Sequence, residues 1–380
     1  MNVLELPTPS ILVDLDVLRA NIRGMADLCK ANNKELWPMV KTHKSSVIAR
    51  MQYEAGAEGF LVGTIEEAEV LASKGFTNIM MAYPVVSPEN LKRVIDLTRE
   101  ARVVLTLDSV ETASLVNKIL NKHGVSMEYL IKVDCGGRRL GVEPEKVTRL
   151  AEKLREFTYL KLRGVCTHSG HAYNVRSAEE VRQTAEDEVR ALRTAVDLLK
   201  DEGYEASVVA TGCTPTARYV VRSEVVNVMR PGSYVFYDAM QVALGTTTIE
   251  NCALTVLATV ISRPAPNRLI IDAGSKTLSA DRSSRNIPIL RGYGIVKEHP
   301  ELTVTSLSEE VGKIEVEGRT DVGVGDKIEI IPSHACVVAN NTSYLVGHRG
   351  GEVEAIIPVD ARERIKPPIS IKPTSYSPEE

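Results

Sequence analysis

Short apolar runs alternate with amphipathic segments between residues 35 and 230, and this alternation constrains the fold more than any other feature of the chain. The amphipathic segments carry apolar residues at helical spacing, and several begin with Ser, Thr or Asp and end with Gly, as helices do. The eight apolar runs end at or near Lys41, Gly63, Tyr83, Asp108, Asp134, His168, Thr211 and Arg230. Eight strand–helix units predict a (β/α)8 TIM barrel, with an open doubly wound sheet as the alternative.

The sequence pattern changes after about residue 245, where strand-like runs follow one another without helical spacers. Gly, Pro, Asn and Asp separate these runs, which is typical of antiparallel strands joined by turns. We therefore predict two domains, a barrel over residues 1–245 and an antiparallel β-domain over residues 246–380. Within the first domain, residues 7–32 are expected to form a strand and a long helix ahead of the barrel.

The composition argues against several classes of protein. The chain has 46 Lys and Arg against 50 Asp and Glu residues, a net charge of −4, so no basic field favours nucleic acid as a partner. No apolar run approaches the roughly 20 residues that span a membrane, and the N-terminus shows no signal-peptide pattern. Six scattered cysteines without a CxxC pair favour reduced thiols in the cytoplasm over a disulfide framework.

Two of the predicted strands end in loops suited to an anion. A parallel barrel carries its reactive groups at the C-terminal ends of its strands, and its last two loops frequently bind phosphate. Here these loops contain Thr211-Gly212 and Gly232-Ser233, whose small residues let backbone N–H groups approach an oxyanion. The alternative is that both are ordinary turns, since short motifs of this kind often occur by chance.

Lys41 ends the first predicted strand and is therefore expected at the same mouth of the barrel. A lysine beside a phosphate site suggests a phosphorylated aldehyde cofactor bound as a Schiff base, which is the chemistry of pyridoxal 5′-phosphate (PLP). His168, at the end of the sixth strand, offers an imidazole that could pack against the cofactor ring. The structural alternatives are a solvated surface lysine and a histidine satisfied within the core.

His334 and Cys336 are the second notable pair of side chains. They stand two residues apart in a predicted strand, so they would share one face and could reach a single ion. A neutral imidazole and a thiolate suit Zn²⁺. By spacing alone, a core histidine near an inert buried cysteine is the favoured alternative.

Six motifs in order along the chain resemble those of the fold-type III PLP enzymes: PMVKTHK (38–44), DCGGRRLG (134–141), GVCTHSGHAYN (164–174), TGCTPT (211–216), RPGSYVFYD (230–238) and IPSHAC (331–336). The most similar branch contains D-threonine aldolase, eukaryotic-type D-serine dehydratase and D-3-hydroxyaspartate aldolase, with alanine racemase a more distant relative. The resemblance extends from about residue 5 to about residue 365. It implies an alanine racemase-like PLP-binding barrel, a D-serine dehydratase-like β-domain with a metal site, and a homodimer.

The resemblance also implies roles for individual residues. Lys41 resembles the lysine that forms the Schiff base and acts as the base facing the α-hydrogen of a D-amino acid. His168 resembles the histidine that stacks on the pyridine ring, Arg139 an arginine that supports the cofactor and its lysine, and Tyr173 a tyrosine near the cofactor. The implied phosphate-binding set is Thr211, Gly212, Gly232, Ser233 and Tyr234.

The pair His334 and Cys336 resembles the metal ligands of this branch, in which dehydratases carry His-x-Cys with zinc and aldolases carry His-x-Asp with manganese or magnesium. The resemblance implies a PLP- and metal-dependent lyase of small D-β-hydroxy-α-amino acids, with Zn²⁺ favoured over Mn²⁺ or Mg²⁺. Dehydration of D-serine, the D-serine ammonia-lyase reaction, is the favoured activity. Retro-aldol cleavage to glycine and an aldehyde, as in D-threonine aldolase or D-3-hydroxyaspartate aldolase, is the alternative, and an amino-acid racemase is a more distant one.

Two positions depart from the family pattern. Met39 stands where relatives tend to have His, so a polar contact on the substrate side is missing. Cys213 replaces what is often Gly in the phosphate loop and adds a side chain there.

Overall fold

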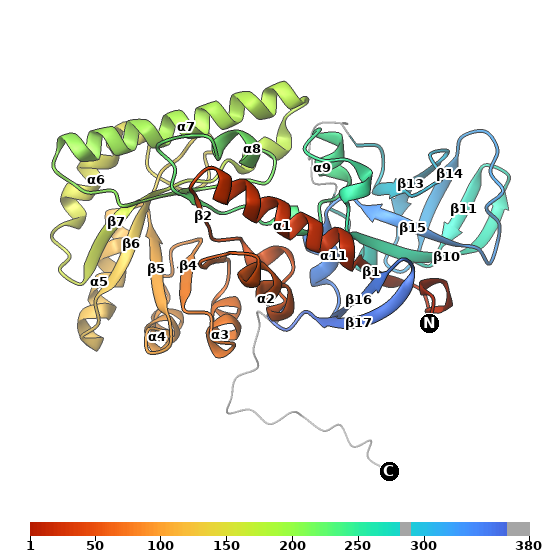
Figure 1. The fold of residues 1–380 in the computed structure, drawn as a ribbon, viewed down its shortest axis with the longest axis horizontal. Coiled ribbons are helices and arrows are strands. Elements are labelled where there is room, and N and C mark those ends of the chain that lie inside the picture. The colour runs from red at the N-terminus through yellow and green to blue at the C-terminus, as the bar shows by residue number, and fades with distance from the viewer. Residues whose placement is uncertain (282–289, 363–380) are drawn as a thin grey trace, which may run out of the picture.

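The structure is a computed structural model that describes residues 1–281 and 290–362. These residues form two units side by side, a parallel barrel surrounded by helices and a domain built on a second sheet (Figure 1). None of the helices within the described ranges is long and apolar enough to cross a membrane. The end of the predicted second domain, beyond residue 362, lies outside the described residues.

The barrel contains eight parallel strands in the order β2-β9-β8-β7-β6-β5-β4-β3. A parallel bridge between Met39 and Leu61 joins the two ends of this order and brings the sheet back onto itself. The predicted (β/α)8 barrel is thereby confirmed. The strands are β2 (Glu35–Leu36), β3 (Phe60–Val62), β4 (Asn78–Met81), β5 (Arg102–Leu107), β6 (Met127–Lys132), β7 (Leu160–Cys166), β8 (Val208–Thr211) and β9 (Val228–Met229).

Most of the helices around the barrel begin at residues whose side chains accept a hydrogen bond from the backbone. Ser45, Thr64, Ser87, Ser109 and Ser177 each cap a helix in this way, which satisfies an otherwise unpaired N–H group of the first turn. The helices of this unit are α1 (Leu15–Ala31), α2 (Ser46–Glu54), α3 (Ile65–Ser73), α4 (Pro88–Leu97), α5 (Val110–His123), α6 (Val147–Leu154), α7 (Ala178–Asp201) and α8 (Ala217–Val220). The helix that follows, α9 (Ala239–Ala243), lies beside the second sheet (Figure 1).

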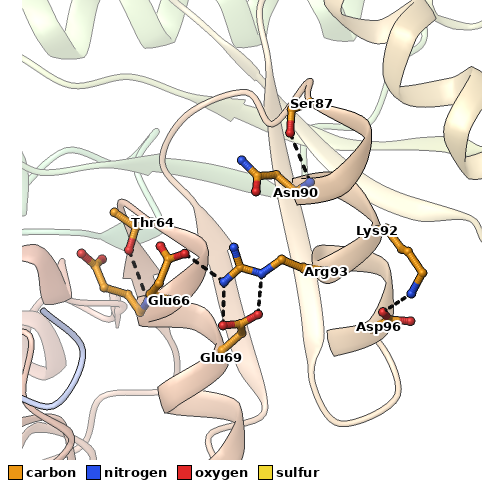
Figure 2. A network of polar contacts seen from close by, with 9 residues as sticks. Thr64, Glu66, Glu69, Ser87, Asn90, Lys92, Arg93 and Asp96 are labelled. Atoms are coloured by element: carbon orange, nitrogen blue, oxygen red, sulfur yellow. Dashed lines mark hydrogen bonds and ion pairs between the residues drawn. The ribbon is translucent and has the colours of Figure 1, made fainter. Parts of the chain in front are cut away.

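Neighbouring helices are tied to each other on the outside of the barrel (Figure 2). Arg93 of α4 donates to Glu69 at 2.7 Å and to Glu66 at 2.9 Å, both on α3, so one guanidinium holds two helices together. Lys92 and Asp96 instead form an exposed pair within α4. Exposed pairs of this kind contribute about 0–1 kcal/mol to stability.

The inside of the barrel is filled with apolar side chains. They form a cluster separate from the main core, which lies between the barrel sheet and its helices and continues into the second domain. Because the barrel is packed rather than hollow, a ligand site belongs at the ends of its strands. The members of the inner cluster are Trp37, Met39, Leu61, Met80, Ala82, Val104, Leu130, Cys166, Ala210 and Val228.

The second unit is a nine-stranded sheet that is antiparallel except where β1 lies parallel to β16. Strand β1 comes from the N-terminal segment and pairs with β10 on its other side. The chain thus begins in the second sheet before α1 leads to the barrel, whereas the predicted boundary at residue 245 placed that strand in the first domain (Figure 1). The elements are β1 (Ser10–Asp14), β10 (Leu254–Ala265), β11 (Arg268–Ile271), α10 (Ser275–Leu278), β12 (Gly294–Val296), β13 (Leu302–Leu307), β14 (Gly312–Val316), β15 (Lys327–Pro332), α11 (Ala335–Asn340), β16 (Tyr344–Arg349) and β17 (Glu352–Pro358).

The first barrel strand is shorter than predicted. β2 ends at Leu36 rather than at Lys41, and Pro38, which follows, has no N–H to donate to a sheet. The chain then forms a 3-10 turn over Val40–Thr42. A turn rather than a continuous strand therefore carries the lysine at the mouth of the barrel.

The prediction of a strand through His334 and Cys336 is wrong. β15 ends at Pro332, His334 is the N-cap residue of α11, and Cys336 lies in the first turn of that helix. The Asp238 carboxylate accepts a hydrogen bond of 3.2 Å from the Ala335 N–H and so stabilises the start of the helix. The two side chains are therefore brought together at a helix N-terminus, not along one face of a strand.

Candidate active site

A cavity of about 530 Å³ lies at the C-terminal ends of the barrel strands and is also lined by residues of the second domain. Its size is that of a small-molecule site. Among the predicted site residues, Thr211 and Tyr234 do not line it. Those that do are Lys41, Arg139, His168, Tyr173, Gly212, Gly232, Ser233, His334 and Cys336.

Lys41 is exposed and forms part of the cavity wall. The turn that carries it is anchored from the second domain, because Asn340 of α11 donates through Nδ2 to the Lys41 carbonyl oxygen at 3.2 Å. The Cys336 Sγ of the same helix lies 3.4 Å from the Thr42 hydroxyl, within hydrogen-bond distance. The position of the lysine thus depends on both domains.

Lys44 does not line the cavity but stabilises the turn that carries Lys41. Its ammonium group pairs with Glu67 of α3 at 3.3 Å, and the other Glu67 oxygen accepts the Gly63 N–H at 2.6 Å. Burial raises the pKa of the Glu67 carboxyl and outweighs the hydrogen bonds from Gly63 and Lys44, which lower it. A buried pair of this kind is costly to break, so it fixes the turn.

His43 begins a buried chain of hydrogen bonds that reaches the loop after β9. Its Nδ1 accepts the Ser45 N–H at 3.1 Å, so Nε2 is the nitrogen that donates to Gln52 Oε1 at 3.2 Å. Gln52 in turn donates to the Tyr234 hydroxyl at 2.9 Å. Burial lowers the pKa of His43 to about 4, so its ring is neutral at physiological pH. The Tyr234 side chain is thereby directed into this chain and not toward the cavity.

The loops after β8 and β9 form a cradle suited to an anion. Gly212 has φ +145°, and an added Cβ would lie 2.6 Å from the Arg230 backbone nitrogen, so the position requires glycine. An added Cβ at Gly232 would lie 2.9 Å from Thr42 Oγ1. Thr214 Oγ1 is buried, and in the described part of the chain it has no hydrogen-bond partner although the residue lines the cavity. A buried hydroxyl without a partner is costly, so this cradle fits the phosphate group of PLP.

The Thr211 hydroxyl points away from this cradle. It donates to the buried carboxylate of Glu188 on α7. Thr214, which was not predicted, is the threonine of the TGCTPT motif that lines the cavity. The motif contained the signal, since each of its threonines offers a hydroxyl, but the direction of each side chain depends on its tertiary contacts.

His168 follows β7 and lies in a cationic part of the cavity. Burial and the positive charges of Lys132, Lys41 and Arg139 lower its pKa well below the ordinary value, so the ring is neutral. A neutral, flat ring suits contact with the face of an aromatic cofactor. The Arg139 guanidinium lies 5.9 Å from the centre of the Tyr83 ring, and both residues line the cavity.

Lys132 is a cavity residue that no sequence motif identified. It ends β6 and is 6% exposed, and this burial lowers its pKa to about 8, with the positive charges of Arg230 and Arg139 acting in the same direction. In the sequence it is recognisable only as a lysine at the end of an apolar run, and solvent-exposed lysines also occur at such positions. Besides Lys41, the cavity therefore contains a lysine whose charged form is disfavoured by burial.

Ser233 lies between Tyr173 and the cysteine of the predicted metal pair. Its Oγ is 3.3 Å from the Tyr173 hydroxyl and 3.6 Å from the Cys336 sulfur. Gln241 donates through Nε2 to the Tyr173 hydroxyl at 3.0 Å. Burial raises the pKa of Tyr173 well above its ordinary value, so the phenol stays protonated. These contacts connect the barrel side of the cavity to α11.

His334 and Cys336 stabilise each other's charged forms, an imidazolium and a thiolate, at the wall of the cavity formed by the second domain. Burial opposes the charged form of each group but is outweighed by their mutual attraction. The His334 imidazolium lowers the pKa of Cys336 to about 7. The thiolate, together with Asp281 at 2.6 Å from Nδ1, raises the pKa of His334 well above its ordinary value. A metal ion could replace the proton of the His334 imidazolium, since metal binding to such groups releases protons.

Nitrogen and sulfur donors of this kind suit Zn²⁺. Within residues 1–281 and 290–362, no group of three or more His, Cys, Asp or Glu side chains is arranged to hold a metal ion. Among the described residues, His334 and Cys336 are two cavity side chains in contact with each other that offer such donors to an ion.

The barrel, the second sheet and their shared cavity define a two-domain enzyme with an alanine racemase-like fold. Comparison with known proteins agrees, because residues 13–239 match the family described as "Alanine racemase, N-terminal domain" and residues 253–347 match the "Putative serine dehydratase domain". The chain belongs to the family that joins these two domains, and its relatives over most of its length are PLP-dependent lyases.

The similarity to relatives covers nearly the whole chain. The D-serine dehydratase of Dictyostelium discoideum is 31% identical over 363 residues, which cover 88% of this chain and 91% of the relative. The structure of D-threo-3-hydroxyaspartate dehydratase from Delftia sp. HT23 has a TM-score of 0.88 at 31% identity, over 94% of this chain and 98% of that one. The structure of D-threonine aldolase from Filomicrobium marinum has a TM-score of 0.85 at 30% identity, over 95% of this chain and 96% of that one.

Proposed function

We propose that this protein is a PLP- and metal-dependent lyase of small D-β-hydroxy-α-amino acids that converts D-serine or a close analogue to a keto acid and ammonia. The observation that carries the proposal is that His334 and Cys336 line the same cavity as Lys41. A lysine able to bind an aldehyde and a pair of soft metal ligands thus face one small-molecule site. The relatives named D-serine dehydratase and D-threo-3-hydroxyaspartate dehydratase support this class of reaction.

The barrel residues would hold PLP and move the proton of the substrate. Lys41 would bind its aldehyde, the Gly212 backbone and the Thr214 hydroxyl would bind its phosphate, and neutral His168 would contact its ring. When bound, PLP supplies an electron sink that stabilises negative charge at the substrate α-carbon. The Lys41 amine would accept the proton from that carbon as a general base.

The second domain would hold the metal ion, which we propose to be Zn²⁺ rather than Mn²⁺ or Mg²⁺ because imidazole and thiolate are soft ligands. When bound, the metal supplies Lewis acidity toward the β-hydroxyl of the substrate. Contacts with Thr42 at 3.4 Å and Ser233 at 3.6 Å hold the Cys336 sulfur in place. A structure of D-threo-3-hydroxyaspartate dehydratase described as the metal-free form supports a metal-binding relative.

Metal analysis of purified variants tests the His334–Cys336 pair. Cys336→Ala is expected to lose most of its bound zinc, whereas Cys336→Asp should prefer Mn²⁺ or Mg²⁺ because a carboxylate is a harder ligand. Cys252→Ala is the matched control, since Cys252 is also 7% exposed but does not line the cavity. Equal zinc content in the wild type and Cys336→Ala would remove the proposed site.

Retro-aldol cleavage is the second candidate, because a D-threonine aldolase from Arthrobacter sp is 31% identical over 360 residues. Both reactions would use the same cavity and differ in which bond at the α-carbon lies perpendicular to the cofactor ring. The thiol of Cys336, where a carboxylate would suit a harder metal ion, favours dehydration. Amino-acid racemisation is the more distant alternative.

Product analysis with D-serine and D-threonine distinguishes these reactions. Pyruvate and ammonia from D-serine are the expected products, and Lys41→Ala should form neither. Glycine and acetaldehyde from D-threonine, without pyruvate from D-serine, would establish the aldolase instead. Racemised serine with none of these products would overturn both lyase candidates.

We further propose that the protein is a homodimer in the cytoplasm. The family resemblance supports the dimer, and the six cysteines, all free and buried, suit a reducing compartment. Light scattering after size exclusion should give twice the chain mass of 41.6 kDa, and a value of one chain mass would contradict the dimer.

A further inference from the structure

Glu188 of α7 is a fully buried carboxylate that does not line the cavity and has no part in the chemistry proposed above. Other acidic residues of α7, such as Glu179 and Glu186, are exposed, as expected on the outer face of an amphipathic helix. A buried carboxylate is costly unless its oxygens are hydrogen-bonded. Glu188 is therefore expected to have a specific set of partners.

Three hydroxyl groups donate to this carboxylate. Ser169 Oγ at 2.6 Å and Thr216 Oγ1 at 2.8 Å donate to Oε2, and Thr211 Oγ1 donates to Oε1. The Ser169 and Thr216 hydroxyls also lie 3.3 Å from each other. All four residues are fully buried, so the cluster is shielded from water and its hydrogen bonds are strong.

Each donor stands close in the chain to a residue that lines the cavity. Ser169 directly follows His168, and Thr211 directly precedes Gly212. The third donor, Thr216, stands two residues after Thr214. The carboxylate thus joins the loop after β7 to the loop after β8, and a change in its position would move both loops.

We infer that Glu188 is a positioning residue that sets these two loops for binding the phosphate group of the cofactor, an inference that rests on the proposed function. Because Thr211 donates to Glu188, its hydroxyl is not available to the cavity. The Gly212 backbone and the Thr214 hydroxyl are then the groups of this loop that face the ligand. Phosphate binding by such donors depends on their placement, since hydrogen bonds weaken steeply with distance and angle.

A carboxylate suits this position better than an amide of the same shape. Its two oxygens together accept from all three hydroxyls, whereas glutamine offers one acceptor oxygen and two N–H donors. In Glu188→Gln at least one hydroxyl would have to reverse its hydrogen bond. Thr211 could then donate to the Thr167 carbonyl oxygen, which at 3.4 Å is a weak acceptor. The substitution thus disturbs the loops while it keeps the volume of the buried group.

Comparing PLP with pyridoxal tests this role, because pyridoxal has the same ring and aldehyde but no phosphate. Dissociation constants of both compounds for the full-length apoprotein are measured by absorbance titration. Glu188→Gln is expected to weaken PLP binding about tenfold or more, which corresponds to one hydrogen bond to a charged group. Binding of pyridoxal should weaken clearly less than binding of PLP, by about threefold at most, since only the His168 contact with the ring can respond to a movement of the loop after β7.

Two further variants make the comparison decisive. Thr216→Val keeps the carboxylate and removes one donor, and it should weaken PLP binding about threefold with little effect on pyridoxal. Leu192→Ala removes apolar packing one turn further along α7 and is the matched control. It should lower the Tm while the ratio of the PLP and pyridoxal affinities stays at the wild-type value.

Equal losses of PLP and pyridoxal affinity in Glu188→Gln, or an unchanged affinity for PLP, would overturn the positioning role. If Glu188→Gln does not fold, the same ratio measured on Thr216→Val decides the question. Wild-type protein that binds neither compound would overturn the proposed cofactor, and with it the proposed function, so the two failures are distinguishable.

Discussion

Replacing Gly212 by alanine tests the phosphate cradle in a quantitative way. An added Cβ would lie 2.6 Å from the Arg230 nitrogen and 3.0 Å from the Pro231 nitrogen, and no side-chain rotation can relieve overlap with backbone atoms. An alanine at φ +145° costs about 1–3 kcal/mol, and the overpacking costs about as much again. We expect Gly212→Ala to lose about 4 kcal/mol of unfolding free energy, a fall in Tm of roughly 5–8 °C for a protein of this size.

Gly203→Ala is the matched control, because Gly203 has φ +77° but nothing lies within 4 Å of an added Cβ. It should lose about 1 kcal/mol, or roughly 1–2 °C in Tm. Thermal unfolding followed by circular dichroism measures both losses, and titration with PLP should show at least about a tenfold weaker affinity in Gly212→Ala alone. Equal Tm losses in the two variants, or an unchanged PLP affinity in Gly212→Ala, would refute the close contact between the loops after β8 and β9.

Two further predictions concern buried charges. Glu67→Ala leaves the Lys44 ammonium, which is 12% exposed, without its partner, and we expect it to lose about 3 kcal/mol of unfolding free energy in a urea titration. Lys92→Ala is the control, because its pair is exposed, and it should lose less than about 1 kcal/mol. Similar losses in the two variants would contradict the difference in burial. Lys132→Met should stabilise the apoprotein by about 3 kcal/mol at pH 7, because burial lowers the Lys132 pKa from 10.5 to about 8 and so penalises its charged form in the folded state. That gain should decline as the pH rises from 8 to 10.5 and vanish above it, whereas a gain independent of pH would show that packing is its cause.

The barrel could be predicted from the sequence because each strand–helix unit carries its own local pattern. Thr64 and Ser87, for example, stand directly before helical periodicity and act as N-caps in the structure. The place of Ser10–Asp14 could not be predicted in this way. The segment is recognisable as a strand, but its pairing with β10 and β16 is a contact between distant parts of the chain.

The candidate site shows the same division between local and long-range information. Lys41 and Gly212 could be found because each follows a barrel strand closely in the chain, which is a local signal. Thr211 and Thr214 could not be told apart, because a carboxylate 23 residues earlier in the chain determines where the Thr211 hydroxyl points. Lys132 was missed for a related reason, since its burial exists only once the barrel is assembled.

The largest difference between the predicted and the observed site is the helix that carries Cys336, where a strand was predicted. Apolar residues resume at Ala335 only two polar residues after β15, so the pattern favoured one long strand. Pro332 was the available signal for its end, because proline interrupts a sheet ladder. The cap that Asp238 provides to the following helix comes from nearly a hundred residues earlier, with a sequence separation of 97, and could not be inferred locally.

Reduction with borohydride followed by peptide mapping tests the role of Lys41 most directly. Borohydride fixes PLP to the lysine that has bound its aldehyde, and mass spectrometry then locates the label. The cavity also contains Lys132, whose pKa of about 8 makes its amine available to the same aldehyde. We expect the label on Lys41 alone and its loss in Lys41→Ala. A label on Lys132, or no label on either lysine, would contradict the assignment of Lys41 as the residue that binds the cofactor.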